Sequence, residues 1–532
     1  MPHSLGECQD IPAMTVEGQV VRALGSISAA TLLSRVLGFA RDMLVALVFG
    51  AGPVTDAFFV AFRIPNMLRR LLAEGALSTA VVPVFADYLE TRSREEFVAM
   101  VRAVLGAALF VLTMTTVLGI AAAPWLLRVI APGFTGDPAQ AALTVLLTRV
   151  MFPYLPLVGL AALAMGVLQI HGRFFAAAIG PAIINVGMIV GVVLLARRVE
   201  PPILSLAFGV VLGGVAQLVA QLPSLRRCGL LVGPVYDFRH PALGRVTRLL
   251  LPAVFGLAAV QVSVFVNTLL ASLLPSGSIS FLYYADRVME FPLGVFGIAL
   301  ASASLPTMAR QAAQNDRRGL AATLNFSLRL GFYVAVPATI GLVMLRTPIT
   351  RVLFQRGQFT AEDTVATAQA LLWYAVGLAG FSGARIVAQA FYAIGEASIA
   401  VKVGILSVAV NVVAALALMG PLAHGGLALA SSAGAYANLL LLVVIARRRF
   451  GALGVRSIVA SLVRTTVAGL ALAAWCALML TVWPSAASRW TEAGWLAVAI
   501  VGGAVAFWLA SAAVSAPERS ALTAVLPGRR VR

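Results

Sequence analysis

The chain contains a long series of apolar stretches, most of them at or above the length needed to cross a lipid bilayer. A helix needs about 20 apolar residues to span the hydrocarbon core, and these stretches are bounded by glycine, proline or charged turns. Helices also satisfy all their backbone hydrogen bonds inside a membrane. We therefore predict an all-α polytopic membrane protein with about fourteen transmembrane helices. Their expected ranges are 20–49, 55–88, 97–122, 140–170, 175–196, 203–223, 245–274, 279–311, 319–345, 363–393, 399–419, 425–446, 457–482 and 492–514.

The composition agrees with a membrane protein. Hydrophobic residues make up 60% of the 532 residues and charged residues only 11%, against about 25% in soluble domains. The net charge of +18 would suit nucleic acid, but the basic residues recur in short clusters between apolar stretches rather than in one patch. Such clusters are typical of loops that set membrane topology. Most of them fall on one side, which predicts that both termini are cytoplasmic, and we expect no nucleic-acid partner.

Short matches recur at a nearly constant spacing and indicate an internal repeat. The matching pairs are Arg128-Val129 with Arg351-Val352, Phe134-Thr135 with Phe359-Thr360, and Asn185-Val186 with Asn411-Val412. An even number of predicted helices separates the copies, so both copies have the same orientation. Parallel six-helix repeats form a transporter architecture with the substrate site between the halves. We therefore predict two pseudo-symmetric six-helix lobes around a central cavity, plus two extra C-terminal helices.

This organisation divides the chain into six predicted segments. They are a cytoplasmic N-terminal segment (1–19), an N-lobe (20–223), a cytoplasmic linker (224–244), a C-lobe (245–446), the two extra helices (447–514) and a cytoplasmic tail (515–532). The two extra helices lie outside the repeat.

Charged residues lie inside three predicted helices that are otherwise apolar. In helices one, two and eight they are Arg35, Arg41, Asp42, Asp56, Arg63, Arg69, Arg70, Glu74, Asp286, Arg287 and Glu290. A charge at bilayer depth costs about 2.5–3.5 kcal/mol on insertion scales, so it normally faces a cavity or a partner. Arg35 and Asp42 share a helix face, which predicts an ion pair between them. Glu74 lies one turn after Arg70, within ion-pair reach.

Two interpretations of these charges follow from the residues alone. In the first, ion pairs tie the helices together, since arginines and carboxylates nearly balance. In the second, the arginines line a cavity that holds an anion. Buried ion pairs stabilise a fold only weakly after desolvation, whereas guanidinium groups bind phosphate in a bidentate manner. The second interpretation is favoured, and the expected ligand is anionic and phosphorylated, with Arg70 and Glu290 among the candidate site residues.

Motifs of several catalytic mechanisms are missing from the sequence. The single lysine, Lys402, is not part of a GxxxxGK phosphate loop, and the histidines form no HExxH pair. No G-x-S-x-G nucleophile motif occurs either. We therefore expect a transporter rather than an enzyme, with no catalytic residue, no metal site and no cofactor.

Two long motifs resemble a known family. The run SRVLGFARDMLVALVFGAGPVTDAFFVAFRIPNMLRRLLAEGALSTAVVPVFADYLE (Ser34–Glu90) is similar to the opening of the MurJ/MviN lipid II flippases. The run SGSISFLYYADRVMEFPLGVFGIALASASLP (Ser276–Pro306) is similar to helices seven and eight of that family. The resemblance covers nearly the whole chain. It implies the fold of the MOP exporter superfamily, in which two six-helix lobes surround a central cavity and helices thirteen and fourteen form a groove for a lipid tail.

The resemblance also implies a substrate and a set of site residues. The substrate is lipid II, a disaccharide-pentapeptide joined by diphosphate to undecaprenol, which the family moves from the inner to the outer leaflet for peptidoglycan synthesis. The matching positions are Arg35, Arg41, Arg69, Arg287, Ser34, Asp56 and Glu74. Among the arginines of helix two, the match to the family favours Arg69 as the site residue. In a straight helix Arg63 and Arg70 would instead share a face with Asp56, and a bend at Pro65 would change that register. Some relatives bind sodium through carboxylates and amides on helices seven and eleven. Here those helices carry Asn267 and Asn411 but no carboxylate, so the sodium site is not carried over to this chain.

We therefore predict a lipid II flippase that works by alternating access in the bacterial cytoplasmic (inner) membrane. Arg41, Arg69 and Arg287 would capture the diphosphate in the inward-open state. We expect a monomer, with the cell-wall synthesis machinery as a candidate partner and with the membrane potential, H+ or Na+ as open candidates for the driving force. Three alternatives stay open: a MOP-type flippase for another undecaprenyl-diphosphate oligosaccharide, a membrane glycosyltransferase, and a cation-coupled drug exporter.

Overall fold

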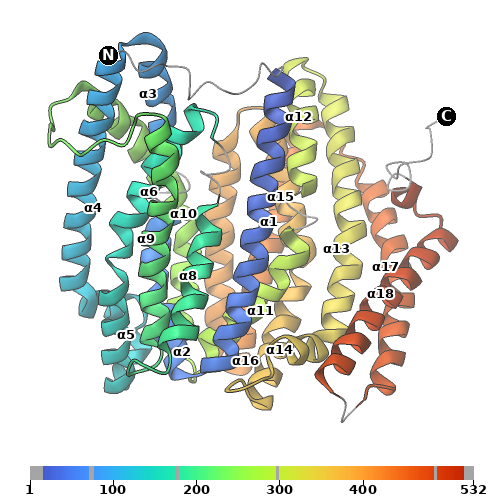
Figure 1. Ribbon diagram of the computed structural model, residues 1–532. Helices are drawn as coiled ribbons and strands as arrows, with labels where there is room; N and C mark the ends of the chain where they lie inside the picture. The colour runs from blue at the N-terminus through green and yellow to red at the C-terminus, as the bar shows by residue number, and fades with distance from the viewer. Residues whose placement is uncertain (1–15, 71–76, 174–178, 295–298, 485–487, 521–532) are drawn as a thin grey trace. The chain divides into compact units, whose positions relative to one another are not determined.

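The computed structural model describes residues 16–70, 77–173, 179–294, 299–484 and 488–520 (Figure 1). Within these ranges the regular secondary structure is helical, and none of it is strand. The predicted all-α fold is therefore confirmed. The chain divides into two compact units, Met1–Leu273 and Leu274–Arg532.

The first unit is a bundle of long and short helices. They are α1 (Val16–Phe49), α2 (Pro53–Arg69), α3 (Leu77–Thr91), α4 (Arg94–Ile130), the 3-10 turn η2 (Pro132–Gly136), α5 (Pro138–Met151), α6 (Tyr154–Ile170), α8 (Gly180–Leu195), α9 (Leu204–Arg227) and α10 (Pro241–Ser272). One buried apolar core joins α3, α4 and α6, and it includes Phe85, Met100 and Leu168. Helix α8 packs on both α1 and α9, as Figure 1 also shows for α8 and α9.

Helices α8 and α9 approach each other closely because glycines line their contact. A Cβ atom added at Gly187 would lie 2.4 Å from the Cα atom of Gly213, and one added at Gly191 would lie 2.6 Å from the carbonyl oxygen of Ser205. Both obstacles are backbone atoms, which cannot rotate out of the way. The contact therefore fixes α8, and with it Asn185, against the rest of the unit.

We expect Gly187→Val to lower the thermal unfolding temperature of the purified protein. Overpacking a tight contact costs about 1–3 kcal/mol, and here only a movement of α9 could relieve it. Gly404→Val is the matched control, because a Cβ atom at Gly404 meets nothing within 4 Å. Equal unfolding temperatures for the two variants in detergent would contradict the close approach of α8 and α9.

The second unit contains α11 (Ser278–Pro292), α12 (Ala299–Ala313), α13 (Arg317–Phe354), α14 (Ala361–Val376), α15 (Leu378–Ala393), α16 (Ala397–Phe450), α17 (Val455–Thr481) and α18 (Arg489–Ala513). Helix α13 packs on α12, α14, α15 and α17, and α18 packs on α17 and α13 (Figure 1). Leu328, Ile386 and Leu442 belong to the apolar core that joins α13, α15 and α16. Thr360 and Asp363 form a reciprocal capping box that starts α14, satisfying backbone amides of the first turn.

Polar contacts fasten α18 to α13 at both of its ends. The Arg329 guanidinium donates to Glu518 Oε1 at 2.6 Å, just beyond the end of α18, and the Tyr333 hydroxyl donates to Ser511 Oγ at 2.8 Å. At the other end, Arg351 Nη2 lies 3.1 Å from Glu492 Oε1. Helix α18 is thus joined to α13 by charged groups as well as by apolar packing.

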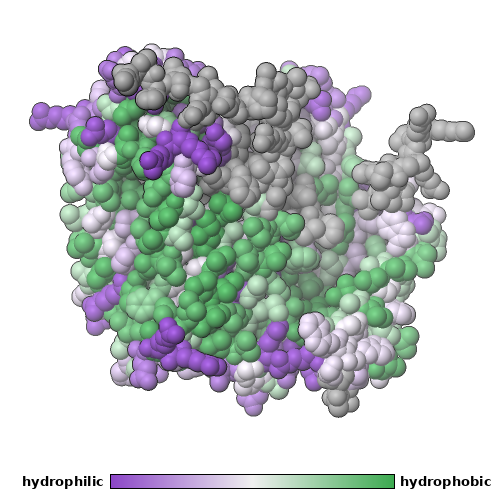
Figure 2. Space-filling model, viewed as in Figure 1, coloured by the Kyte–Doolittle hydropathy of each residue, from purple (hydrophilic) through white to green (hydrophobic). Residues whose placement is uncertain are grey.

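The helices carry the apolar surface of a multi-pass membrane protein. Among the described residues, seven helical stretches are long and apolar enough to cross a bilayer when α5 and α6 together count as one, or eight if the bent pair α14 and α15 also counts as one span. Figure 2 shows hydrophobic residues over the middle of the helices of the first unit and hydrophilic residues toward their two ends. Seven or eight spans do not establish the predicted fourteen, so that number stays a prediction.

Several predicted helices are divided or joined in the structure. The predicted helix 140–170 is formed by α5 and α6, which a turn at Phe152 and Pro153 separates. The predicted helix 363–393 is α14 and α15, bent by 41°. The predicted helices 55–88 and 279–311 each correspond to two described helices, with residues 71–76 and 295–298 outside the described ranges. The predicted helices 399–419 and 425–446 follow one another in α16, where Ala423 has a non-helical φ of 47° shortly after Pro421.

The boundary between the two compact units falls at a different residue from the predicted boundary between the lobes. Helix α10 belongs to the first unit, where it packs on α3 and α4, whereas the predicted C-lobe begins at residue 245. Packing contacts alone do not define a repeat, since a helix of one repeat can pack against the other. The predicted segment boundaries therefore stay predictions.

Candidate functional site

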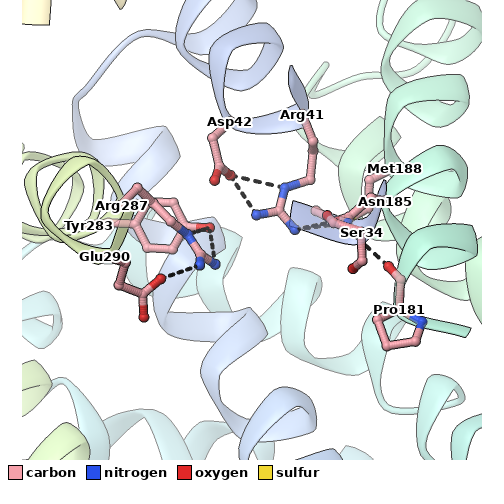
Figure 3. A network of polar contacts seen from close by, with 9 residues as sticks. All are labelled: Ser34, Arg41, Asp42, Pro181, Asn185, Met188, Tyr283, Arg287 and Glu290. Atoms are coloured by element: carbon pink, nitrogen blue, oxygen red, sulfur yellow. Dashed lines mark hydrogen bonds and ion pairs between the residues drawn. The ribbon is translucent and has the colours of Figure 1, made fainter. Parts of the chain in front are cut away.

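Arg41 lies at the centre of a buried polar network between α1 and α8 (Figure 3). Its side chain is only 8% exposed. Its Nε and Nη2 atoms donate to Asp42 Oδ1 at 3.0 and 2.6 Å, and its Nη1 atom donates to Asn185 Oδ1 at 2.8 Å. The Met188 sulfur lies 3.7 Å from Nη1. The guanidinium is therefore neutralised by Asp42 and tied to a second helix by Asn185.

Asn185 connects the two helices in the other direction. Its side-chain nitrogen donates to the Ser34 carbonyl oxygen at 3.1 Å and to the Pro181 carbonyl oxygen at 3.0 Å. The predicted site residue Ser34 is thus part of the network, through its backbone carbonyl. An amide in an apolar helix is costly unless it is hydrogen-bonded, and Asn185 is bonded on both sides. It therefore positions Arg41 and is a site residue that the sequence analysis did not single out.

The predicted ion pair between Arg35 and Asp42 is wrong. Asp42 pairs with Arg41, its neighbour in sequence, while Arg35 is exposed and makes no hydrogen bond or ion pair with any residue that the structure describes. Seven residues correspond to about 10 Å along a helix axis, which is far for a direct contact. Arg41 is next to Asp42 in the sequence, so its side chain reaches the carboxylate directly.

The predicted residues of α2 have different environments. Asp56 is buried in the first turn of α2, where the positive end of the helix dipole favours a carboxylate. Arg69 Nε and Nη2 donate to Asn66 Oδ1 at 3.1 and 3.0 Å. Arg70 is exposed directly after the end of α2. Arg63 Nη1 donates to the Val264 carbonyl oxygen of α10 at 3.4 Å.

Glu74 lies outside the described residues, so the predicted pair of Arg70 with Glu74 stays a prediction. Asn66, which holds Arg69, is a further residue that the sequence analysis missed. Its position one turn before Arg69 was a usable signal, because side chains three residues apart are neighbours on a helix.

In the second unit, Arg287 is held by two residues of its own helix, α11 (Figure 3). Its Nη1 atom donates to Glu290 Oε2 at 2.9 Å, and its Nε and Nη2 atoms donate to the Tyr283 hydroxyl oxygen at 3.3 and 3.2 Å. The guanidinium carbon lies 5.1 Å from the centre of the Tyr283 ring. The side chain of Arg287 is 33% exposed and that of Glu290 is 47% exposed. Arg287 is therefore oriented by Tyr283 yet accessible, in contrast to Arg41.

The two arginines differ in what they could bind. Arg41 already uses three of its N–H groups for Asp42 and Asn185, so an external anion would compete with these partners. Arg287 is paired with an exposed carboxylate, and exposed pairs contribute only about 0–1 kcal/mol. An exchange of Glu290 for a phosphate group therefore costs little. Among the described residues, no three histidine, cysteine, aspartate or glutamate side chains gather in a way that would hold a metal ion, and the expected absence of a metal site stays a prediction.

Solved structures show what class of protein this fold defines. The chain is similar to a structure of a lipid II flippase MurJ in an inward closed conformation, with a TM-score of 0.77 and 23% identity, over 93% of this chain and 99% of the other. It is also similar to an inward-facing multidrug resistance MATE family transporter of the MOP superfamily, with a TM-score of 0.64 and 16% identity, over 82% of this chain and 99% of the other. The chain therefore belongs to the same fold class as these two membrane proteins.

Sequence comparison identifies the family within that class. The family model described as lipid II flippase MurJ matches residues 45–504. The lipid II flippase MurJ of Burkholderia cenocepacia is 39% identical over 432 residues, which is 80% of this chain and 84% of the relative. The probable lipid II flippase MurJ of Vibrio cholerae is 37% identical over 440 residues, 81% of this chain and 83% of the relative. The chain belongs to the MurJ family of lipid II flippases, which confirms the resemblance noted in the sequence.

Proposed function

We propose that this protein moves lipid II from the inner to the outer leaflet of the bacterial cytoplasmic membrane. Family membership over residues 45–504 is the observation that carries this proposal. The motifs Ser34–Glu90 and Ser276–Pro306 contain both arginines of Figure 3, so the charged side chains belong to the segments that resemble the family. A transporter of this family needs no catalytic residue, and we propose that the protein is not an enzyme.

Arg41, Arg69 and Arg287 would bind the diphosphate of the substrate. Guanidinium groups suit this role because they donate two parallel hydrogen bonds to phosphate oxygens. Arg287 and Arg69 would bind first, since Tyr283 and Asn66 orient them, and Arg41 would follow by exchanging Asp42 for the diphosphate. Arg35, Arg70 and Asp56 would set the charge around the headgroup, together with Ser34 and Glu74.

The energy source follows from the charge of the substrate. Each elementary charge that crosses 100 mV changes the free energy by about 2.3 kcal/mol. A membrane potential that is negative inside favours outward movement of an anion, so we propose the potential as the first driving force, with H+ or Na+ coupling as the alternatives. We also propose a monomer with both termini in the cytoplasm, working beside the cell-wall synthesis machinery.

Replacement of an essential flippase tests the function. A bacterium depleted of its own lipid II flippase should resume growth when it expresses this chain, and lipid II should again become accessible from outside the cell. Empty vector and the depleted flippase itself are the controls. Failure to restore growth, with the protein present in the membrane, would contradict the proposal. Restored surface polysaccharide without exposed lipid II would indicate a different undecaprenyl-diphosphate oligosaccharide as substrate.

A further inference from the structure

Three arginines gather in the second unit where α13 ends and α18 begins. Arg351 lies in the last turn of α13, Arg356 follows that helix, and Arg489 is the first residue of α18. The ion pair of Arg351 with Glu492, at 3.1 Å, brings the two helix ends together. These residues all belong to one unit.

The cluster has more positive than negative charge. Glu492 is the one carboxylate that forms an ion pair with these arginines among the described residues, and its partner is Arg351. Arg489 is exposed, and it forms no ion pair or hydrogen bond with a described residue. Arg356 forms no ion pair either, so two positive charges are left over.

Arg356 is held in place by the end of α13. Its Nη2 atom donates to the carbonyl oxygens of Leu353, at 2.5 Å, and Val352, at 3.4 Å. These bonds are those of a cation that closes a helix C-terminus, which is favourable in itself. They occupy one terminal nitrogen and leave the Nε and Nη1 atoms for another partner. The helix end therefore explains where Arg356 lies and leaves these two nitrogen atoms available.

Burial, and then the positive charge of Arg489, lower the pKa of the Arg356 guanidinium. Both effects disfavour the positively charged form of Arg356 when no anion is bound. An anion placed between the two guanidinium groups would reverse the second effect. Phosphate fits this role, because two arginines can surround its oxygens with charge-assisted hydrogen bonds.

The neighbouring side chain indicates where the anion comes from. Trp490, next to Arg489, is 89% exposed. Tryptophan is enriched at the level of lipid headgroups, where its ring meets the apolar region and its N–H group meets water. A phosphate that reaches these arginines at that depth would belong to a membrane lipid.

We propose that Arg356 and Arg489 bind the phosphate group of a membrane lipid at the junction of α13 and α18. The proposal does not depend on the proposed binding of lipid II by Arg41, Arg69 and Arg287. Two lipids carry suitable chemistry, an anionic phospholipid and a polyprenyl diphosphate. Arg351 stays with Glu492 and positions the two helix ends.

Native mass spectrometry of the full-length protein tests the site. The probes are phosphatidylglycerol, phosphatidylcholine as a phosphate with no net charge, and farnesyl diphosphate. Wild type should retain phosphatidylglycerol or farnesyl diphosphate, and Arg356→Gln with Arg489→Gln should bind it at least about 10-fold more weakly, which corresponds to the loss of charge-assisted bonds. The matched control is Arg197→Gln with Arg198→Gln, a pair of exposed neighbouring arginines in the first unit, which should bind as wild type does.

A second variant excludes a folding artefact. Arg356→Lys with Arg489→Lys keeps both positive charges and the Arg351–Glu492 pair, so it should bind more tightly than the double glutamine variant and less tightly than wild type. Retention of phosphatidylglycerol identifies a phospholipid site, and retention of farnesyl diphosphate alone identifies a polyprenyl diphosphate site. Equal binding by wild type and the Arg356 and Arg489 double variant would overturn the proposal. An equal loss of lipid binding in the Arg197 and Arg198 control would also overturn it. So would tight binding of phosphatidylcholine that none of these substitutions changes.

Discussion

Arg287→Ala should reduce the flipping of fluorescent lipid II in proteoliposomes by about 100-fold or more. The substitution removes at least two charge-assisted bonds to the diphosphate, worth about 3 kcal/mol together, and each 1.36 kcal/mol is tenfold in rate. The fold should survive, because Arg287 is one-third exposed and its carboxylate partner Glu290 is nearly half exposed. Glu290 stays in contact with water when the guanidinium is removed.

The controls for Arg287 separate charge from geometry. Arg287→Lys keeps the charge but loses the planar fork and the stacking on Tyr283, so it should lie between wild type and Arg287→Ala. Arg310→Ala removes an exposed arginine at the end of α12 in the same unit, and it should flip normally. A wild-type rate for Arg287→Ala, in vesicles with equal amounts of protein, would show that this arginine does not bind the substrate.

Arg41→Ala should destabilise the protein as well as stop transport. Removing one partner of a buried ion pair costs about 3–5 kcal/mol, and here it deprives both Asp42 and Asn185 of the guanidinium that bonds them. Thermal unfolding in detergent should show a clear decrease, larger than that of Gly187→Val. Loss of flipping alone would therefore not prove a role in binding for this residue.

A paired substitution distinguishes the two roles of Arg41. Arg41→Met with Asp42→Leu removes both charges together and keeps apolar volume, and such replacements of buried ion pairs are often neutral or stabilising. The unfolding temperature should return toward that of wild type, while flipping stays lost if Arg41 binds the diphosphate. Recovery of both stability and flipping in the double variant would reduce Arg41 to a structural ion pair.

The helical fold could be predicted because apolar length is visible in the sequence. The predicted helix 457–482 corresponds to α17 (Val455–Thr481), and 492–514 corresponds to α18 (Arg489–Ala513). The divisions at Pro153 and between α14 and α15 were not predicted, because an apolar run continues through a turn or bend without any change in composition. Packing between helices decides where such a run breaks.

The sequence indicates which charged side chains lie inside helices, but not which partners they have. The cost of a charge at bilayer depth made Arg41 and Arg287 candidate site residues. In the structure Arg287 pairs with Glu290, three residues further along the same helix. Helix periodicity then suggested Arg35 for Asp42, since it indicates which side chains share a face but not how far a long side chain can bend. Asn185 lies on a helix distant in sequence, so its bond to Arg41 depends on the packing of α8 against α1. No local pattern contains that contact.

The double attachment of α18 to α13 has an evolutionary consequence. A shorter ancestor that ended after α16 would have exposed Arg329 and Tyr333 to hydrocarbon, where an unpaired charge costs several kcal/mol. The last two helices and the polar residues of α13 must therefore have been acquired together, or with lipid-facing substitutions along α13 in between. Truncation before α17 should accordingly prevent folding. A nonsense mutation at that point in the gene would therefore abolish function.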